Sequence, residues 1–135
     1  MNAQDRPLPD LDDPVTAPFW QHARDGELWM PGCAACGALR WPASTRCPEC
    51  LGADVTWRRV SGRGRVWSMA TYHRAFQPAF AGDLPYTIAI VELSEGPTMI
   101  GRLVDPAGLG PGSQVVAVFE PLTSQVTLVR FAAAG

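Results

Sequence analysis

Hydrophobic residues in the C-terminal half of the chain fall into short runs that are separated by turn-forming residues. Five runs are rich in β-branched and aromatic residues and predict strands, at residues 65–72, 86–93, 98–104, 114–119 and 126–131. The intervening segments 94–97 (SEGP) and 105–112 (DPAGLGPG) carry the Gly and Pro signals of turns. Five strands in about 70 residues, of which the first is the longest, match the Greek-key barrel of an OB fold.

A different pattern marks the N-terminal arm. Residues 1–15 are rich in Pro and Asp, and Thr16 can cap a short helix that ends just before Gly26. The apolar face of this helix consists of Phe19, Trp20 and Ala23. His22 lies on its polar side, where we expect a solvated side chain. Because so short a helix is unstable alone, it must dock, either on its own domain or on a partner protein.

Composition and charge narrow the class of protein. The 135 residues are 47% hydrophobic and 18% charged, so the chain can build a core. The net charge of −2 argues against a generic nucleic-acid binder, although residues 40–74 form a basic island with seven Arg and two acidic residues. No apolar run approaches the roughly 20 residues of a membrane span, and the polar, acidic N-terminus does not resemble a signal peptide. We therefore expect a cytoplasmic protein that does not enter a membrane.

Four cysteines are the most informative chemical feature. They form two pairs, Cys33-x2-Cys36 and Cys47-x2-Cys50, within 18 residues. In a reducing compartment disulfides are disfavoured, and paired CxxC motifs indicate a metal site. Four thiolates without an open coordination position predict a structural zinc, and iron can occupy the same arrangement. A segment of about 30 residues has too little core to fold unaided, so the metal would supply its folding energy.

The order of these features is similar to that of a known family, the acyl-CoA-associated zinc-ribbon/OB-fold proteins catalogued as domain of unknown function thirty-five. The resemblance extends over residues 18–119. Its marks are Pro18-Phe19-Trp20, Gly26-Glu27-Leu28, Cys33-x2-Cys36-Gly37, Pro42, Cys47-Pro48-x-Cys50, Ser61-Gly62-x-Gly64-x-Val66, Pro85-Tyr86, Val91-x-Leu93-x-Glu95-Gly96 and Gly112-x-x-Val115-x-x-Val118-Phe119. One departure is Leu51, where many members have Gly after the last cysteine.

The expected architecture is mainly β. It combines a helical arm (1–29), a four-cysteine zinc ribbon of the rubredoxin-like type (30–59) and a five-stranded OB barrel (60–135). The resemblance implies a non-catalytic accessory subunit that completes an acyl-CoA-processing enzyme and shapes its CoA or acyl site. The first-choice partner is a thiolase-fold enzyme that makes or breaks a carbon–carbon bond, such as a steroid side-chain aldolase or an acyltransferase. Because such a partner is expected to be a homodimer, symmetry suggests an α2β2 assembly.

Two alternatives remain at this stage. One is partnership with a hotdog-fold enoyl-CoA hydratase. The other is a single-stranded nucleic-acid-binding module, in which Trp67 and Tyr72 would stack on bases. The two histidines and the carboxylates form no obvious acid–base or nucleophilic set, so we expect no autonomous catalytic site.

Several residues are candidates for contact with CoA or with the partner. Arginine forks bind phosphate in bidentate fashion, and aromatic residues dominate protein interfaces. The candidates for this contact are Arg58, Arg59, Arg63, Arg65, His73, Phe76 and Phe80, and those for helix docking on a partner are Phe19 and Trp20. The competing interpretations are a solvated basic face for the arginines, a solvent-facing loop for His73, a lid over the barrel end for the phenylalanines and docking on the chain's own domain for the helix.

Overall fold

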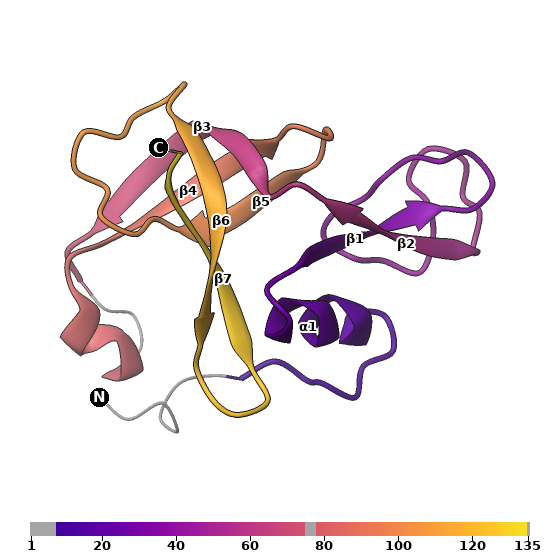
Figure 1. The fold of residues 1–135 in the computed structure, drawn as a ribbon, viewed down its shortest axis with the longest axis horizontal. Coiled ribbons are helices and arrows are strands. Elements are labelled where there is room, and N and C mark those ends of the chain that lie inside the picture. Colours follow the sequence, from indigo (N-terminus) through magenta and orange to yellow (C-terminus); the bar gives the residue numbers. More distant parts are fainter. Residues whose placement is uncertain (1–7, 75–77, 135) are drawn as a thin grey trace.

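The structure is a computed structural model that describes residues 8–74 and 78–134 (Figure 1). Its elements are α1 (Ala17–Arg24), β1 (Leu28–Cys33), β2 (Val55–Val60), β3 (Arg63–Tyr72), the 3₁₀ helix η2 (Pro78–Asp83), β4 (Tyr86–Leu93), β5 (Thr98–Arg102), β6 (Gln114–Pro121) and β7 (Thr127–Ala133). The five strands predicted for the C-terminal half are therefore present, with shifted ends. In the described part of the chain no helix is long and apolar enough to cross a membrane.

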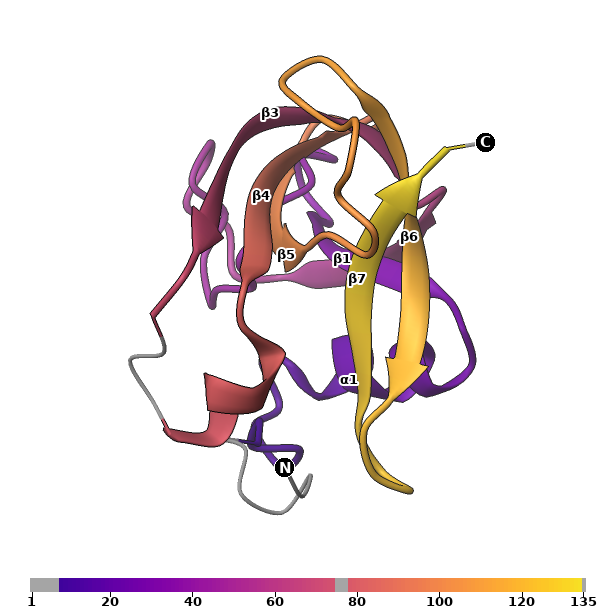
Figure 2. The same ribbon diagram turned by 90° about the vertical axis from the view of Figure 1, so that its left-hand side faces the viewer.

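Strands β3 to β7 form one antiparallel sheet with the order β5-β4-β3-β6-β7. Figure 2 shows the sheet curving round so that its two edge strands approach each other. A parallel bridge between Leu103 and Phe131 joins these edges, and the Val104 N–H donates to the Phe131 carbonyl at 2.7 Å. The sheet is thus a nearly closed five-stranded barrel, which confirms the predicted OB fold.

Strand β3 carries a β-bulge that determines which of its side chains face the barrel interior. Val66 pairs with Val91 on β4, but the next paired residue is Ser68, so Trp67 is the extra residue. A bulge re-aims the side chains around it. Val66 before the bulge is buried and Trp67 is 65% exposed, and the bulge lets Ser68, the next residue, pair with Ile90.

The zinc-ribbon segment is built on a second, two-stranded sheet. Strands β1 and β2 pair antiparallel from Leu28↔Val60 to Cys33↔Val55, and the cysteine-bearing loops extend from the end of this hairpin away from the barrel (Figure 1). Between the two cysteine pairs, Leu39 makes only an isolated bridge to Gly32, because the strand partner of β1 is supplied from beyond the second pair.

Helix α1 packs on its own chain, against β1 and the barrel strands β6 and β7. Thr16 occupies the N-cap position but its side chain makes no capping hydrogen bond, while Gly26 ends the helix with a φ of 73° as predicted. Phe19 is 3% exposed and joins Leu28, Val60 and the barrel residues in one continuous core. Of the two residues proposed for partner docking, only the half-buried Trp20 leaves part of its surface outside that core.

Candidate metal centre

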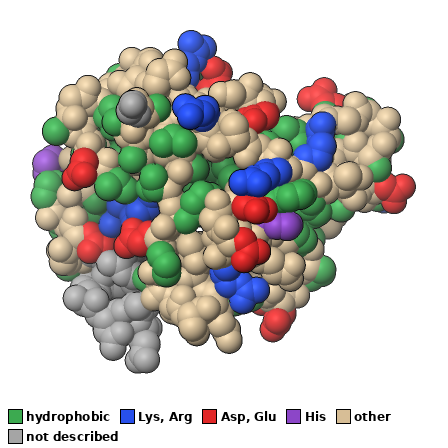
Figure 3. All heavy atoms as spheres, in the orientation of Figure 1, with side chains coloured by type: hydrophobic (Ala, Val, Ile, Leu, Met, Phe, Trp, Pro, Cys, Tyr) green, Lys and Arg blue, Asp and Glu red, His purple; other side chains and the backbone are tan. Residues whose placement is uncertain are grey.

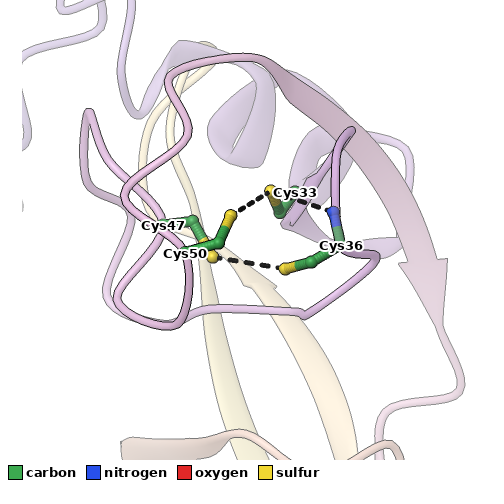
Figure 4. A group of neighbouring side chains, drawn as sticks. All are labelled: Cys33, Cys36, Cys47 and Cys50. Atoms are coloured by element: carbon green, nitrogen blue, oxygen red, sulfur yellow. Dashed lines mark hydrogen bonds between the residues drawn. The ribbon is translucent and has the colours of Figure 1, made fainter.

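The four cysteines converge at the end of the ribbon hairpin (Figure 4). Their Sγ atoms all lie within 4.8 Å of one another, with Cys33 and Cys50 at 3.5 Å and Cys36 and Cys47 at 3.6 Å. These separations exclude disulfides, in which the sulfurs are about 2.05 Å apart. A tetrahedral ion with metal–sulfur bonds of about 2.3 Å holds its sulfurs roughly 3.8 Å apart, which fits the observed cluster.

The two cysteine pairs sit in knuckles with the same hydrogen-bond pattern. The Cys33 N–H donates to Ala38 O, and its carbonyl accepts from the Gly37 N–H, both at 2.8 Å. In the second knuckle, Cys47 N donates to Gly52 O at 2.9 Å and Cys47 O accepts from Leu51 N at 2.8 Å. Each knuckle is therefore a tight loop that presents both of its sulfurs to one point.

Each knuckle also requires a left-handed residue directly after its second cysteine. In the first knuckle this residue is Gly37, with a φ of 78°, and in the second it is Leu51, with a φ of 64°. Glycine adopts this conformation freely, whereas a residue with a Cβ is strained there. The Leu51 side chain is 70% exposed, so packing offsets little of this strain.

The surroundings divide the thiols into two kinds. The backbone N–H of Cys36 lowers the pKa of Cys33 to about 6 despite burial, and the backbone N–H of Cys50 likewise lowers the pKa of Cys47. For Cys36, the N–H of Ala38 lowers the pKa, but the sulfurs of Cys47 and Cys33 together with burial outweigh it and raise the pKa to about 12. The pKa of Cys50 is raised in the same way, mainly by Cys33, against the lowering effect of the Gly52 N–H. The first cysteine of each pair thus favours the thiolate, the form that binds metal.

Arg40, which the sequence did not single out, organises the loop between the two cysteine pairs. Its guanidinium is buried, with 4% of the residue exposed, and both Nε and Nη2 donate to the carbonyl of Ser44, at 3.2 and 3.0 Å. Its backbone N–H donates to Pro31 O at 2.9 Å, which ties the loop to β1. The remaining nitrogen, Nη1, is buried without a hydrogen-bond partner among residues 8–74 and 78–134.

The arginines Arg58 and Arg59 of the basic island lie on β2 and contact the ribbon and the helix end. Arg58 Nη2 donates to the carbonyl of Gly37 in the first knuckle. Arg59 Nη1 lies 3.6 Å from the Glu27 carboxylate, and both residues line a groove of about 400 Å³ between the ribbon hairpin and the barrel. Figure 3 shows basic and acidic side chains next to one another at this junction. The island is therefore partly neutralised by its own chain.

The arginines of β3 differ from each other in their partners. Arg65 forms an ion pair with Glu92 on β4, with an N–O distance of 2.9 Å. Arg63 is exposed, and its guanidinium has no ion-pair or hydrogen-bond partner among the described residues. Arg63 is thus the candidate whose guanidinium is most available for a ligand.

The remaining contact candidates lie beyond the end of β3. His73 is exposed in the bend that follows this strand. Phe76 lies outside the described residues, and for Phe80 the structure describes only the backbone, in η2.

His22 is not the solvated surface residue that we expected. Its imidazole is half-buried and stacks on the indole of Trp29, with ring centroids 4.2 Å apart and an interplanar angle of 14°. The Trp29 Nε1 donates to Glu27 Oε1 at 2.9 Å, and His22 Nδ1 lies 3.9 Å from the same oxygen. His22 is half-buried because the turn after α1 brings the last turn of the helix alongside the start of β1.

Family models match two parts of the chain. The model described as the ChsH2 rubredoxin-like zinc ribbon domain matches residues 20–56, and that of the ChsH2 C-terminal OB-fold domain matches residues 57–120. Among solved structures, the chain is similar to one titled "Ltp2-ChsH2(DUF35) aldolase", with 32% identity and a TM-score of 0.82. That match covers 96% of this chain and all of the other chain.

Similarity to curated proteins covers the same parts of the chain. A DUF35 domain-containing scaffold protein of Methanocaldococcus jannaschii is 33% identical over 113 residues, which are 81% of this chain and 79% of that protein. A probable enoyl-CoA hydratase alpha subunit of Thermomonospora curvata is 34% identical over 116 residues. These residues are 84% of this chain but 36% of the hydratase subunit, so the chain spans about a third of that relative.

Proposed function

This chain belongs to the DUF35 family, with a zinc ribbon and an OB-fold domain of the ChsH2 type, and from this premise we propose that it is a non-catalytic accessory subunit of an acyl-CoA-processing enzyme. The observation that carries the proposal is the similarity over 96% of the chain to the structure titled as an Ltp2-ChsH2(DUF35) aldolase. Relatives named as scaffold proteins and as a hydratase alpha subunit support the same role.

The finer proposal concerns the partner. A thiolase-fold enzyme that makes or breaks a carbon–carbon bond is the first candidate, in an α2β2 assembly, and a hotdog-fold hydratase is the second. In either complex the partner would supply the nucleophile or base, and this chain would order the CoA or acyl site. The environments of the described side chains support this division, because the four thiols converge on one another and His22 is stacked on Trp29 beside Glu27.

We further propose that Cys33, Cys36, Cys47 and Cys50 hold a structural zinc ion, in a cytoplasmic setting that keeps the thiols reduced. Bound zinc would supply a tetrahedral cross-link between the two knuckles. The sulfur geometry and the paired knuckles support this assignment, because four protein ligands leave no position open for a substrate. The chain's own residues then provide the rest of the ribbon, with Arg40 and Arg58 bound to the carbonyls of its loops.

Metal analysis of the purified chain tests the zinc assignment. We expect one zinc per chain by mass spectrometry, loss of the metal in Cys33→Ser, and loss of ribbon structure in that variant. Ser44→Ala is the matched control, because its backbone carbonyl still accepts from Arg40. If the purified chain instead contains one iron per site and shows thiolate-to-iron absorption in the visible range, the bound metal is iron and not zinc.

Co-purification tests the accessory role. The tagged chain is isolated from its source organism, bound proteins are identified by mass spectrometry, and the enzyme found is then purified with and without the chain. We expect an acyl-CoA enzyme in stoichiometric amount, whose turnover and solubility increase when the chain is present. Robust turnover by the isolated chain would refute the proposal, as would micromolar binding of single-stranded oligonucleotides at physiological salt, which would favour the nucleic-acid alternative.

A further inference from the structure

A stripe of apolar side chains crosses the outer face of the barrel on three adjacent strands. It consists of Trp67 on β3, Ile90 on β4 and Ile100 on β5. Ile90 pairs directly with Ile100, and Trp67 is the bulged residue beside the Ser68–Ile90 pair. Trp67 is 65% and Ile100 67% exposed, while Ile90 between them is half-buried. Large aromatic and aliphatic side chains grouped in this way on a surface mark an interaction site.

The position of this apolar stripe supports the same conclusion. In OB folds the face of the second and third barrel strands is a binding surface, which in many members takes oligonucleotides or oligosaccharides. Here those strands are β4 and β5, which carry Ile90 and Ile100. The bulge in β3 adds Trp67 at the border of this face, so the extra residue of the bulge widens it.

The charges that border the apolar stripe are already matched within the chain. On one side Arg65 pairs with Glu92 at 2.9 Å. On the other side Arg102 pairs with Asp83 at 3.0 Å, and its guanidinium lies over the ring of Tyr86, 4.3 Å from the ring centroid. A nucleic-acid ligand needs cations that are free to meet phosphates. An apolar centre within a neutralised polar rim is instead the composition of a protein–protein interface.

We propose that the apolar stripe of Trp67, Ile90 and Ile100 is the surface on which the acyl-CoA enzyme subunit docks, with Trp67 as the anchor that enters an apolar pocket of that subunit. This inference rests on the proposed function. The outer surface of a barrel is convex, so it fits a concave partner. A second copy of the chain would present the same convex face in a two-fold dimer and make little contact.

The test uses the enzyme that co-purifies with the chain and the variants Trp67→Ser, Ile100→Asp and their combination. Both side chains are largely exposed, so the variants should keep the fold, which circular dichroism and zinc content check. Because few residues dominate an interface, we expect the double variant to bind the enzyme at least about 100-fold more weakly in calorimetric titration. Leu8→Asp is the control, since it removes an exposed apolar side chain that lies outside both the apolar stripe and the cysteine knuckles, and it should bind within about twofold of wild type.

Four other results would overturn the inference, and each of them points to a different explanation. If the wild-type complex forms and the double variant binds equally well, the docking surface lies elsewhere and the accessory role stands. If the wild-type chain binds no acyl-CoA enzyme, both proposals fail. If ultracentrifugation shows a homodimer that the double variant dissociates, the occupant is a second copy. If single-stranded DNA binds wild type but not Trp67→Ser, the stripe is a base-stacking platform.

Discussion

A Cβ atom placed on Gly101 would lie 2.8 Å from Cδ2 of Phe131, so the phenyl ring fills the space in front of this glycine. Phe131 is fully buried, and its backbone makes the parallel bridge to Leu103 that joins the two edge strands. The closure of the barrel therefore depends on a close approach between β5 and β7 that only a residue without a side chain permits at position 101.

Gly101→Ala should destabilise the barrel by about 1–3 kcal/mol, because the new methyl group would push Phe131 out of a packed core. Urea unfolding measures the change. Gly110→Ala is the matched control, since a Cβ there meets nothing within 4 Å, and it should be neutral or slightly stabilising. Equal stability of the two variants would show that the seam between β5 and β7 can relax.

Leu51→Gly should stabilise the ribbon by up to about 1 kcal/mol, which reverses the usual effect of replacing leucine by glycine. The φ of 64° strains leucine, and its exposed side chain contributes little packing. Thermal unfolding of the metal-loaded protein measures the change. Leu51→Ala keeps the strain and should show no gain, so a greater loss of stability with Gly than with Ala would contradict this account.

Arg40→Ala should destabilise the ribbon by about 2–3 kcal/mol, because two charged N–H donors to Ser44 O are lost in a buried setting. The rate of zinc transfer to a chelator reports ribbon opening directly and should increase. Arg46→Ala removes one exposed bond to Leu51 O and serves as the control. Indistinguishable transfer rates for the two variants would exclude a special role for Arg40.

The barrel was predictable from the sequence and the ribbon hairpin was not, for a physical reason. Strands such as β4 alternate between buried and half-buried residues, and this period of two appears in the hydrophobic pattern. Strand β2 has four exposed residues among its first five, with Val60 its only buried one. β2 belongs to a small sheet that extends from the barrel. Because neither face of this strand packs on a large core, its sequence shows no alternation of apolar and polar residues.

The metal ligands were predictable because CxxC spacing encodes local geometry. Arg40 was not, since an arginine in a basic island suggests a solvated charge, and only the folded loop places Ser44 O against it. The stacking of His22 on Trp29 likewise depends on the turn after α1. The left-handed conformation required at Leu51 could have been found, because the family pattern has glycine at that position.

Acidification through about pH 6 should weaken the binding of the metal, because it protonates the Cys33 thiolate. The pKa of Cys33 is lowered to about 6, so its thiolate contributes stability that is complete above the ordinary thiol pKa and lost as the pH falls through about 6. Bound metal competes with protons and shifts release to still lower pH. A colorimetric chelator follows zinc release across a pH series, and substantial loss already at pH 7 would contradict the prediction.

Arg63→Ala should weaken CoA-thioester binding by the enzyme complex about tenfold. Among the four candidate arginines of the basic island, Arg63 is the one whose guanidinium has no partner in the described part of the chain. The loss should shrink as salt screens the phosphate charges. Calorimetric titration measures affinity, and gel filtration confirms that the complex still assembles. Arg24→Ala, which removes an exposed arginine of α1 outside the island, is the control. Unchanged affinity together with unchanged assembly would assign Arg63 to the solvated surface, and a loss of assembly instead would place it at the subunit interface.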